Sequence, residues 1–198
     1  MKILAFTDHH GSPNDFKFAK KKAKGVDLIL HMGDFTIFEH EIEAIMAEMN
    51  NMGKPVLFIH GNHEDDLIVE YLCKKFKNLK FIHKKHYEID GVVFLGYGGG
   101  GFSMIDKEFE KHSKKFEKAM KGKKTILMLH GPPYGTKADI IMGDHVGNES
   151  FTKFIKKNQP EIVLCGHLHE NFHVKSKIKK SVVINPGPDG EIIEIWDF

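Results

Sequence analysis

The sequence predicts an α/β fold in which two sheets pack face to face and helices cover their outer faces. The first half of the chain alternates apolar runs with amphipathic segments, an order typical of neighbouring parallel strands. The second half contains several short strands joined by tight turns and two further helical segments, which a second sheet accommodates. At 198 residues the chain is long enough for one substantial domain, which we expect to span residues 1–198.

The first half yields three strands and three helices. Pro13 and Asn14 are helix-start signals after the first apolar run. The second helical segment has an apolar stripe with a period of about 3.6 residues, and Gly53 and Pro55 end it. The predicted strands are Lys2–Thr7, Asp27–Met32 and Pro55–His60, and the predicted helices lie near Asn14–Ala23, Glu39–Met52 and Glu64–Phe76.

The second half differs from the first in having short strands joined by tight turns such as Asp90-Gly91. The predicted helices are Met104–Lys121, which is long and charged, and Glu149–Asn158. Segment 131–147 is rich in Gly and Pro and is expected to be a loop. The predicted strands lie near Phe81–Ile82, Tyr87–Ile89, Val92–Tyr97, Thr125–His130, Glu161–Gly166, His173–Val174, Val182–Asn185 and Glu191–Trp196.

Composition and charge exclude several classes of protein. No apolar run approaches the roughly 18 residues of a transmembrane helix, and the N-terminus lacks a secretory pattern. Cys73 and Cys165 are far apart and form no CxxC motif, so we expect a reducing cytoplasm and no membrane partner. The formal net charge is +2 and all 29 basic residues are lysine, which argues against long nucleic acid as a partner.

Residues of metal-ligand type follow five of the predicted strands. Ligands of open α/β sheets bind outside the carboxyl ends of the strands, so these residues predict one shared polynuclear site. Oxygen and imidazole ligands without thiolate suit Mn, Fe, Zn, Ni or Co better than Ca or Cu(I). A central Asp can also bridge two ions. The motifs are Asp8-His9-His10, Gly33-Asp34, Gly61-Asn62-His63, His130-Gly131 and Gly166-His167-Leu168-His169.

The residues alone leave some roles open. His60 and His130 both end a strand and precede Gly, so either could be a ligand. His145 is open between substrate contact and solvent exposure. The run 98–101 lacks the Gly-Lys-Ser/Thr ending of a Walker motif, which favours a flexible turn near the mouth of the site. We expect packing, surface or supporting roles for His9, His31, His40, His60, His83, His86, His112 and His173.

The order of the five motifs resembles the signature of the calcineurin-like metallophosphoesterases over essentially the whole chain. Three further stretches resemble the Icc-related branch of that family: Gly33-Asp34-Phe35-Thr36, His130-Gly131-Pro132-Pro133-Tyr134-Gly135 and Ile184-Asn185-Pro186-Gly187. The resemblance implies a four-layer α/β/β/α sandwich of two mixed sheets flanked by helices. One departure is Ile37, where many relatives carry Asp or Glu three residues beyond the bridging Asp.

The resemblance also implies a dinuclear centre with Asp34 as the bridge, and it selects His130 over His60. By the resemblance, one ion is held by Asp8, His10, Asp34 and His169, and the other by Asp34, Asn62, His130 and His167. His63 follows a ligand but has no ligand role, so we expect it to be catalytic as the general acid.

We therefore expect a hydrolase with two divalent transition-metal ions (Mn, Fe, Zn, Ni or Co) that cleaves phosphodiester bonds of small molecules or nucleotides. The ions would polarise the phosphoryl oxygens and activate a bridging hydroxide. One alternative is a nuclease, which would need an extended basic channel or a capping domain. The other alternative is a non-catalytic scaffold, which would tend to lose ligand residues that this chain retains.

Overall fold

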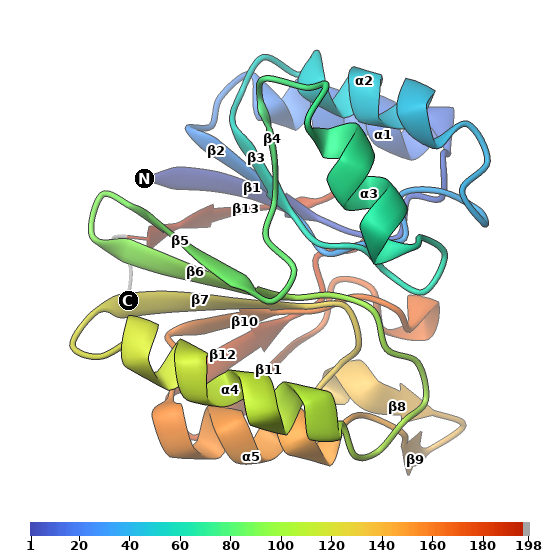
Figure 1. Ribbon diagram of the computed structural model, residues 1–198. Helices are drawn as coiled ribbons and strands as arrows, with labels where there is room; N and C mark the ends of the chain where they lie inside the picture. Colours follow the sequence, from blue (N-terminus) through green and yellow to red (C-terminus); the bar gives the residue numbers. More distant parts are fainter. Residues whose placement is uncertain (196–198) are drawn as a thin grey trace.

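The computed structural model describes residues 1–195, in which two large sheets lie face to face (Figure 1). The first sheet has the strand order β13-β1-β2-β3-β4. Strands β1 to β4 are parallel, and β13 is an antiparallel edge strand beside β1. The bounds are β1 Lys2–Phe6, β2 Leu28–His31, β3 Val56–Phe58, β4 Leu79–Phe81 and β13 Glu191–Glu194.

The second sheet has the order β11-β12-β10-β7-β6-β5. Its four central strands are parallel, and the two edge strands β5 and β11 are antiparallel to their neighbours. The bounds are β5 Lys85–Ile89, β6 Val92–Tyr97, β7 Lys124–Leu129, β10 Ile162–Leu164, β11 Lys175–Ile178 and β12 Ser181–Ile184. Both large sheets are therefore mixed.

Three buried clusters separate the four layers. One lies between the sheets and joins residues such as Ile3 and Leu30 to Phe94. Another packs the outer face of the first sheet against three helices, and the third packs the second sheet against two. The helices are α1 Pro13–Ala23, α2 Ile42–Asn50, α3 Asp66–Cys73, α4 Lys107–Ala119 and α5 Glu149–Asn158. The expected α/β/β/α sandwich is confirmed.

Helix ends follow local chemistry, and α2, α3 and α4 are shorter than the sequence predicts. Ser12 accepts a hydrogen bond from the Asp15 amide at the start of α1, and Asp106 caps α4 in the same way. The second helix begins at Ile42 rather than near Glu39. Its preceding residues, including Phe38 and Glu39, have positive φ angles that a helix does not allow.

The segment 131–147 is more ordered than the loop predicted for it. It contains the 3₁₀ turn η1 (Lys137–Asp139) and a hairpin of β8 (Ile140–Ile141) and β9 (Asp144–His145). Buried Asp139 accepts hydrogen bonds from the amides of residues 135, 136 and 147 and from the His145 imidazole. The segment is therefore ordered by hydrogen bonds to one buried carboxylate, and the periodicity of apolar residues does not reveal this order.

Three strand predictions need correction. The strand expected at His173–Val174 is absent there, and β11 starts at Lys175 instead. The strand expected at Phe81–Ile82 ends at Phe81 and belongs to the first sheet, beside β3. The last strand, β13, ends at Glu194, whereas Trp196, the end of the predicted strand, lies outside the described residues.

The two sheets place the ends of β1, β2, β3, β7 and β10 on one side of the molecule. Backbone hydrogen bonds join the loops that follow them: the Asp8 amide donates to the Gly33 carbonyl, and the Gly166 amide donates to the His130 carbonyl. The loops that carry the sequence motifs are thus tied to each other. No helix among residues 1–195 has both the length and the apolar character needed to cross a membrane.

Candidate metal centre

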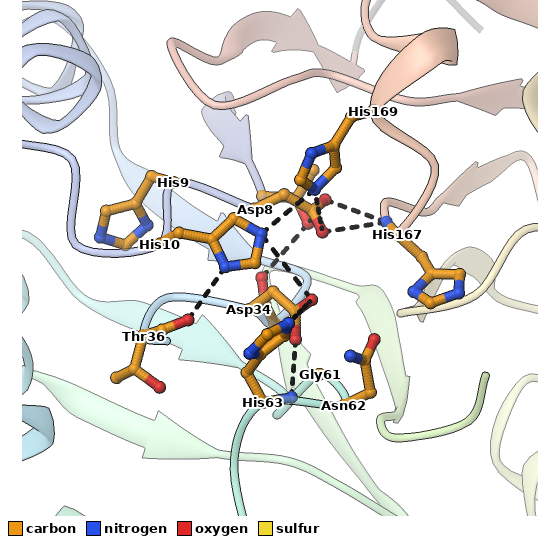
Figure 2. Close-up of polar contacts among 12 residues, drawn as sticks. Asp8, His9, His10, Asp34, Thr36, Gly61, Asn62, His63, His167 and His169 are labelled. Atoms are coloured by element: carbon orange, nitrogen blue, oxygen red, sulfur yellow. Dashed lines mark hydrogen bonds and ion pairs between the residues drawn. The ribbon is translucent and has the colours of Figure 1, made fainter. Parts of the chain in front are cut away.

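The predicted ligand residues that follow β1, β2, β3 and β10 converge in three dimensions (Figure 2), and His130, after β7, joins them. Three groups have potential ligand atoms that all lie within 4.8 Å of one another. Asp34 belongs to two of these groups, and His10 joins the first to the third. The groups are Asp8, His10 and His169; Asp34, His130 and His167; and His10, Asp34 and His63.

The Asp34 carboxylate lies at the middle of the centre. Its Oδ1 accepts a hydrogen bond of 3.0 Å from the His63 amide. Its Oδ2 faces imidazole nitrogens on several sides, with Nε2 of His130 at 3.4 Å and Nε2 of His10 and His63 each at 3.9 Å. The Asp34 carboxylate therefore lies between the His10 and His63 rings and the His130 ring.

The Asp8 carboxylate is fixed by its own neighbours. The Thr7 hydroxyl donates to Oδ2 at 2.7 Å, and the His167 amide donates to both carboxylate oxygens at 3.0 and 3.1 Å. This last contact links the loop after β1 to the loop after β10. Asp8 and His169 thereby reach the same half of the site, where His169 Nε2 is 3.9 Å from Asp8 Oδ1.

Two imidazoles are oriented in the way that metal ligands usually are. His10 Nδ1 lies 2.9 Å from the Thr36 carbonyl and His130 Nδ1 lies 2.8 Å from the Met32 carbonyl. A carbonyl only accepts, so each Nδ1 carries a hydrogen and each ring turns Nε2 toward the site, where this atom can bind an ion once it carries no proton. His130 Nε2 is also 3.0 Å from Asn62 Oδ1, which places that amide oxygen in the same half.

His167 supplies the test of whether this centre suits a metal ion. Its Nε2 atom is buried and has no hydrogen-bond partner among the described residues. An orphaned buried nitrogen is costly unless something binds its lone pair. Burial first, and then the charge of His130, lowers the pKa of His167 to about 4, so the ring is neutral. A neutral imidazole beside two carboxylates and further imidazoles fits a divalent transition-metal ion.

His63 differs from the other imidazoles of the centre. The Phe38 amide donates to His63 Nδ1 at 3.3 Å, so the hydrogen of the neutral ring lies on Nε2. That N–H faces the centre, 3.9 Å from Asp34 Oδ2. His63 thus differs from His10 and His130, in which a backbone carbonyl holds the hydrogen on Nδ1 and leaves Nε2 as the atom that can bind an ion.

The charges of Asp34 and His130 are coupled. Burial alone would raise the pKa of Asp34, but its hydrogen bond to His130 and the charge of that ring outweigh burial and lower it. Burial disfavours the charged His130 ring, yet the Asp34 carboxylate raises its pKa to about 9. Burial also raises the pKa of Asp8.

The backbone of the centre is strained where it carries the candidate ligands. Asp8, His10, Asp34 and His167 have φ angles between 46° and 70°, a region that residues other than Gly rarely adopt. Such strain clusters at functional sites and persists only where the surroundings impose it. Two glycines allow the close approach of the carboxylates. A Cβ at Gly61 would lie 1.9 Å from Asp34 Oδ1, and one at Gly166 would lie 2.2 Å from Asp8 Oδ2.

The other histidines occupy different positions. His9 is set apart from the converging group in Figure 2 and contacts buried His31 at 3.0 Å. His60 packs against His83, with ring centroids 4.4 Å apart, and belongs to none of the three groups. His145 is held by Asp139 at 2.8 Å.

Sequence reasoning missed Glu64, which supports the loops of the centre through hydrogen bonds. Its buried carboxylate accepts hydrogen bonds from the Gly61, Asp34 and Thr36 amides and from the Thr36 hydroxyl, at 2.8 to 3.1 Å. It therefore supports the second motif through the Asp34 and Thr36 amides. An acid directly after Asn62-His63 was the available signal, but nothing in the apolar pattern marked it as buried.

A hollow of about 540 Å³ opens over the centre. His10, Asp34, Asn62, His63, His167 and His169 form one part of its lining. Ile37, Phe102, Ile141, Leu168 and Glu170 form the rest. The site is thus an accessible cluster of carboxylate and imidazole groups beside an apolar wall.

Comparisons with known proteins agree with this architecture. The family model for calcineurin-like phosphoesterases matches residues 1–171. An uncharacterised protein of Methanocaldococcus jannaschii is 32% identical over 201 residues, covering 95% of this chain and 88% of that protein. A crystal structure of a protein from Thermus thermophilus has a TM-score of 0.76 at 17% identity and covers 94% of this chain and 88% of the other. A dimetal phosphatase from Danio rerio has a TM-score of 0.66 at 10% identity, covering 93% and 86%.

The chain belongs to the calcineurin-like phosphoesterase family. The family match covers all of the predicted ligand motifs, and the structural neighbours share the two-sheet fold. Membership implies a hydrolase of phosphoric esters, and the histidine and aspartate clusters are candidate metal sites within that fold.

Proposed function

We propose that this protein is a dinuclear metal-dependent phosphodiesterase. The observation that carries the proposal is the position of Asp34, whose carboxylate belongs to two groups of potential ligand atoms. A carboxylate placed in this way can bridge two ions at the roughly 3.5–4 Å separation of two-metal hydrolases. The name of the structurally similar dimetal phosphatase is consistent with this proposal.

The two halves of the centre would each hold one ion, with Asp34 shared. We assign Asp8, His10, Asp34 and His169 to the first half and Asp34, Asn62, His130 and His167 to the second, which the groups of neighbouring ligand atoms and the contact of Asn62 with His130 support. When bound, two divalent ions would supply Lewis-acid activation of the phosphoryl group and of water. The donor set suits Mn, Fe, Zn, Ni or Co.

The residues of the chain would perform the remaining chemistry. Hydrolysis forms a bond from a water oxygen to phosphorus and breaks the bond from phosphorus to the leaving oxygen, which needs a proton. His63 would donate that proton from Nε2 in its protonated imidazolium form, because Nε2 is the nitrogen that faces the centre, and the ring would return to neutral imidazole. The proton released by the attacking water would pass to solvent, which would reprotonate the ring after the alcohol leaves.

We further propose a small phosphodiester as the substrate. The hollow over the centre accommodates a small organic phosphate, and the near-neutral charge of the chain does not favour a long polyanion. A nuclease or a non-catalytic scaffold is the alternative outcome of the test below. The two free cysteines support a reducing, cytoplasmic setting.

The test is a panel of phosphodiesters and matching monoesters assayed with metal-free protein reloaded with one divalent metal at a time. The proposal expects turnover that depends on metal and favours the diesters. Asp34→Asn should abolish it, whereas Asp90→Asn, at an exposed turn between β5 and β6, should not. Full activity in verified metal-free protein, or turnover of monoesters alone, would contradict the proposal.

A further inference from the structure

The wall of the hollow suits an uncharged organic group. Beyond the residues of the centre it consists of four apolar side chains and the acid Glu170. Among the described residues that line it there is no lysine, although the chain contains 29. Once ions neutralise the phosphoryl oxygens, a substrate with further negative charge would find no partner on this wall and would face Glu170.

Two exposed phenylalanines pack on imidazoles of the centre from opposite sheets. The Phe38 ring centroid lies 4.4 Å from that of His63, and the Phe102 centroid lies 5.0 Å from that of His167. Phe102 is 65% exposed and lines the hollow, whereas Phe38 is 77% exposed and lies at its margin, against the His63 ring that lines it. Their segments follow β2 of the first sheet and β6 of the second (Figure 1). Large aromatic surfaces left in water beside a site are typical of ligand contacts.

Phe38 adds an independent observation. Its φ angle is +46°, a conformation that is unfavourable for a bulky residue. The backbone there serves His63, because the Phe38 amide donates to His63 Nδ1. Any residue could make that contact, so it does not explain an aromatic ring that remains exposed in a strained turn. Strained positions of this kind cluster where a ligand is held.

We propose that Phe38 and Phe102 are the specificity-determining platforms for the two organic groups of the phosphodiester. Phe38 packs on His63 and holds the leaving group, while Phe102 packs on His167 and holds the group that stays on phosphorus. The substrate class is then a phosphodiester whose two organic groups are uncharged and present flat aromatic or apolar surface. This assignment rests on the proposed function, because His63 defines the leaving side.

The test uses two substrates with the same leaving group, methyl p-nitrophenyl phosphate and benzyl p-nitrophenyl phosphate, with metal-loaded protein. Wild type should prefer the benzyl ester by about tenfold in kcat/KM, mainly through KM, as expected for one aromatic stacking partner. Phe102→Ala should bring the ratio near one, and Phe102→Trp should retain it. Phe38→Ala should lower kcat/KM for both substrates by a similar factor and leave the ratio unchanged.

Phe18→Ala is the matched control, since Phe18 is a 56% exposed phenylalanine on α1 that, among the described residues, packs on no imidazole of the centre, unlike Phe38 and Phe102. It should change neither substrate, and metal content should be equal in all variants. A 4-carboxybenzyl ester should be cleaved more slowly than the benzyl ester. Equal turnover of methyl and benzyl esters by wild type, or an unchanged preference in Phe102→Ala, would contradict the proposed binding of organic groups by these phenylalanines. Absence of any metal-dependent turnover in wild type would instead overturn the proposed function.

Discussion

Replacing Glu64 by Gln tests how the centre is supported without touching a candidate ligand. In the wild type, Oε1 accepts from the Thr36 amide and hydroxyl, and Oε2 accepts from the Asp34 and Gly61 amides. A glutamine has one carbonyl oxygen, so one pair of these donors would face an NH₂ group. If the NH₂ group faces Thr36, the Thr36 hydroxyl can reverse and accept from it, so this orientation loses only one hydrogen bond and should be favoured.

The size of the effect follows from those contacts. Hydrogen bonds to charged groups contribute about 1.5–3 kcal/mol each to the free energy of unfolding, so the one lost bond would cost about 1.5–3 kcal/mol. Burial raises the pKa of Glu64, which means that the buried charge carries a desolvation cost that glutamine removes. We therefore expect a loss of about 2 kcal/mol, or a Tm lower by about 4–8 °C for a chain of this size.

The assay is thermal unfolding in chelator followed by metal titration of the folded variant. Because Glu64 ties down the backbone around Asp34 and Gly61, metal affinity should fall by about 10- to 100-fold. The control is Glu43→Gln, an exposed carboxylate 3.0 Å from Lys75, which should cost less than about 1 kcal/mol. A Glu64→Gln variant with wild-type Tm and metal affinity would refute the reasoning.

Three further predictions concern the site and its histidines. His63→Gln keeps a group that can accept a hydrogen bond from the Phe38 amide but cannot titrate. Turnover of alkyl esters should therefore fall by about 10²–10⁴-fold with metal content retained, and turnover of p-nitrophenyl esters should fall less. Loss of one metal would assign His63 as a ligand instead. Asp34→Asn should weaken both ions, whereas Asn62→Ala should weaken mainly one, as measured by calorimetric titration. Burial lowers the pKa of His9 to about 3 and of His83 to about 2, so unfolding takes up protons below pH 6.5. In urea denaturation, the stability of the metal-free protein should therefore fall on acidification from pH 7 to 5, by up to about 1.4 kcal/mol per pH unit for each such histidine, and a flat profile would contradict this.

The sequence was most informative where parallel strands end. Apolar runs followed by Asp, Asn or His identified every loop of the centre, because the fold brings the carboxyl ends of such strands together. It could not decide between His60 and His130 from the residues, since both follow an apolar run and precede Gly. The three-dimensional structure places His130 against Asp34 and His60 against His83.

Features that depend on buried polar groups were not predictable from periodicity. Glu and Asp usually lie at the surface, yet Glu64 and Asp139 are buried and accept hydrogen bonds from the backbone amides of a loop. Phe38 and Phe102 show the converse, because apolar residues are expected in the core but these two are exposed beside the site. Only the spatial arrangement of the loops reveals these buried acids and exposed phenylalanines.

The most direct test of the account is the number of divalent ions bound per chain. Metal-free protein is reloaded with Mn, freed of excess metal and subjected to elemental analysis against protein concentration. The account predicts two ions per chain in wild type and a marked loss of both in Asp34→Asn, because both ions share that carboxylate. A wild-type protein that binds a single ion, or an Asp34→Asn variant that retains two, would contradict the dinuclear centre.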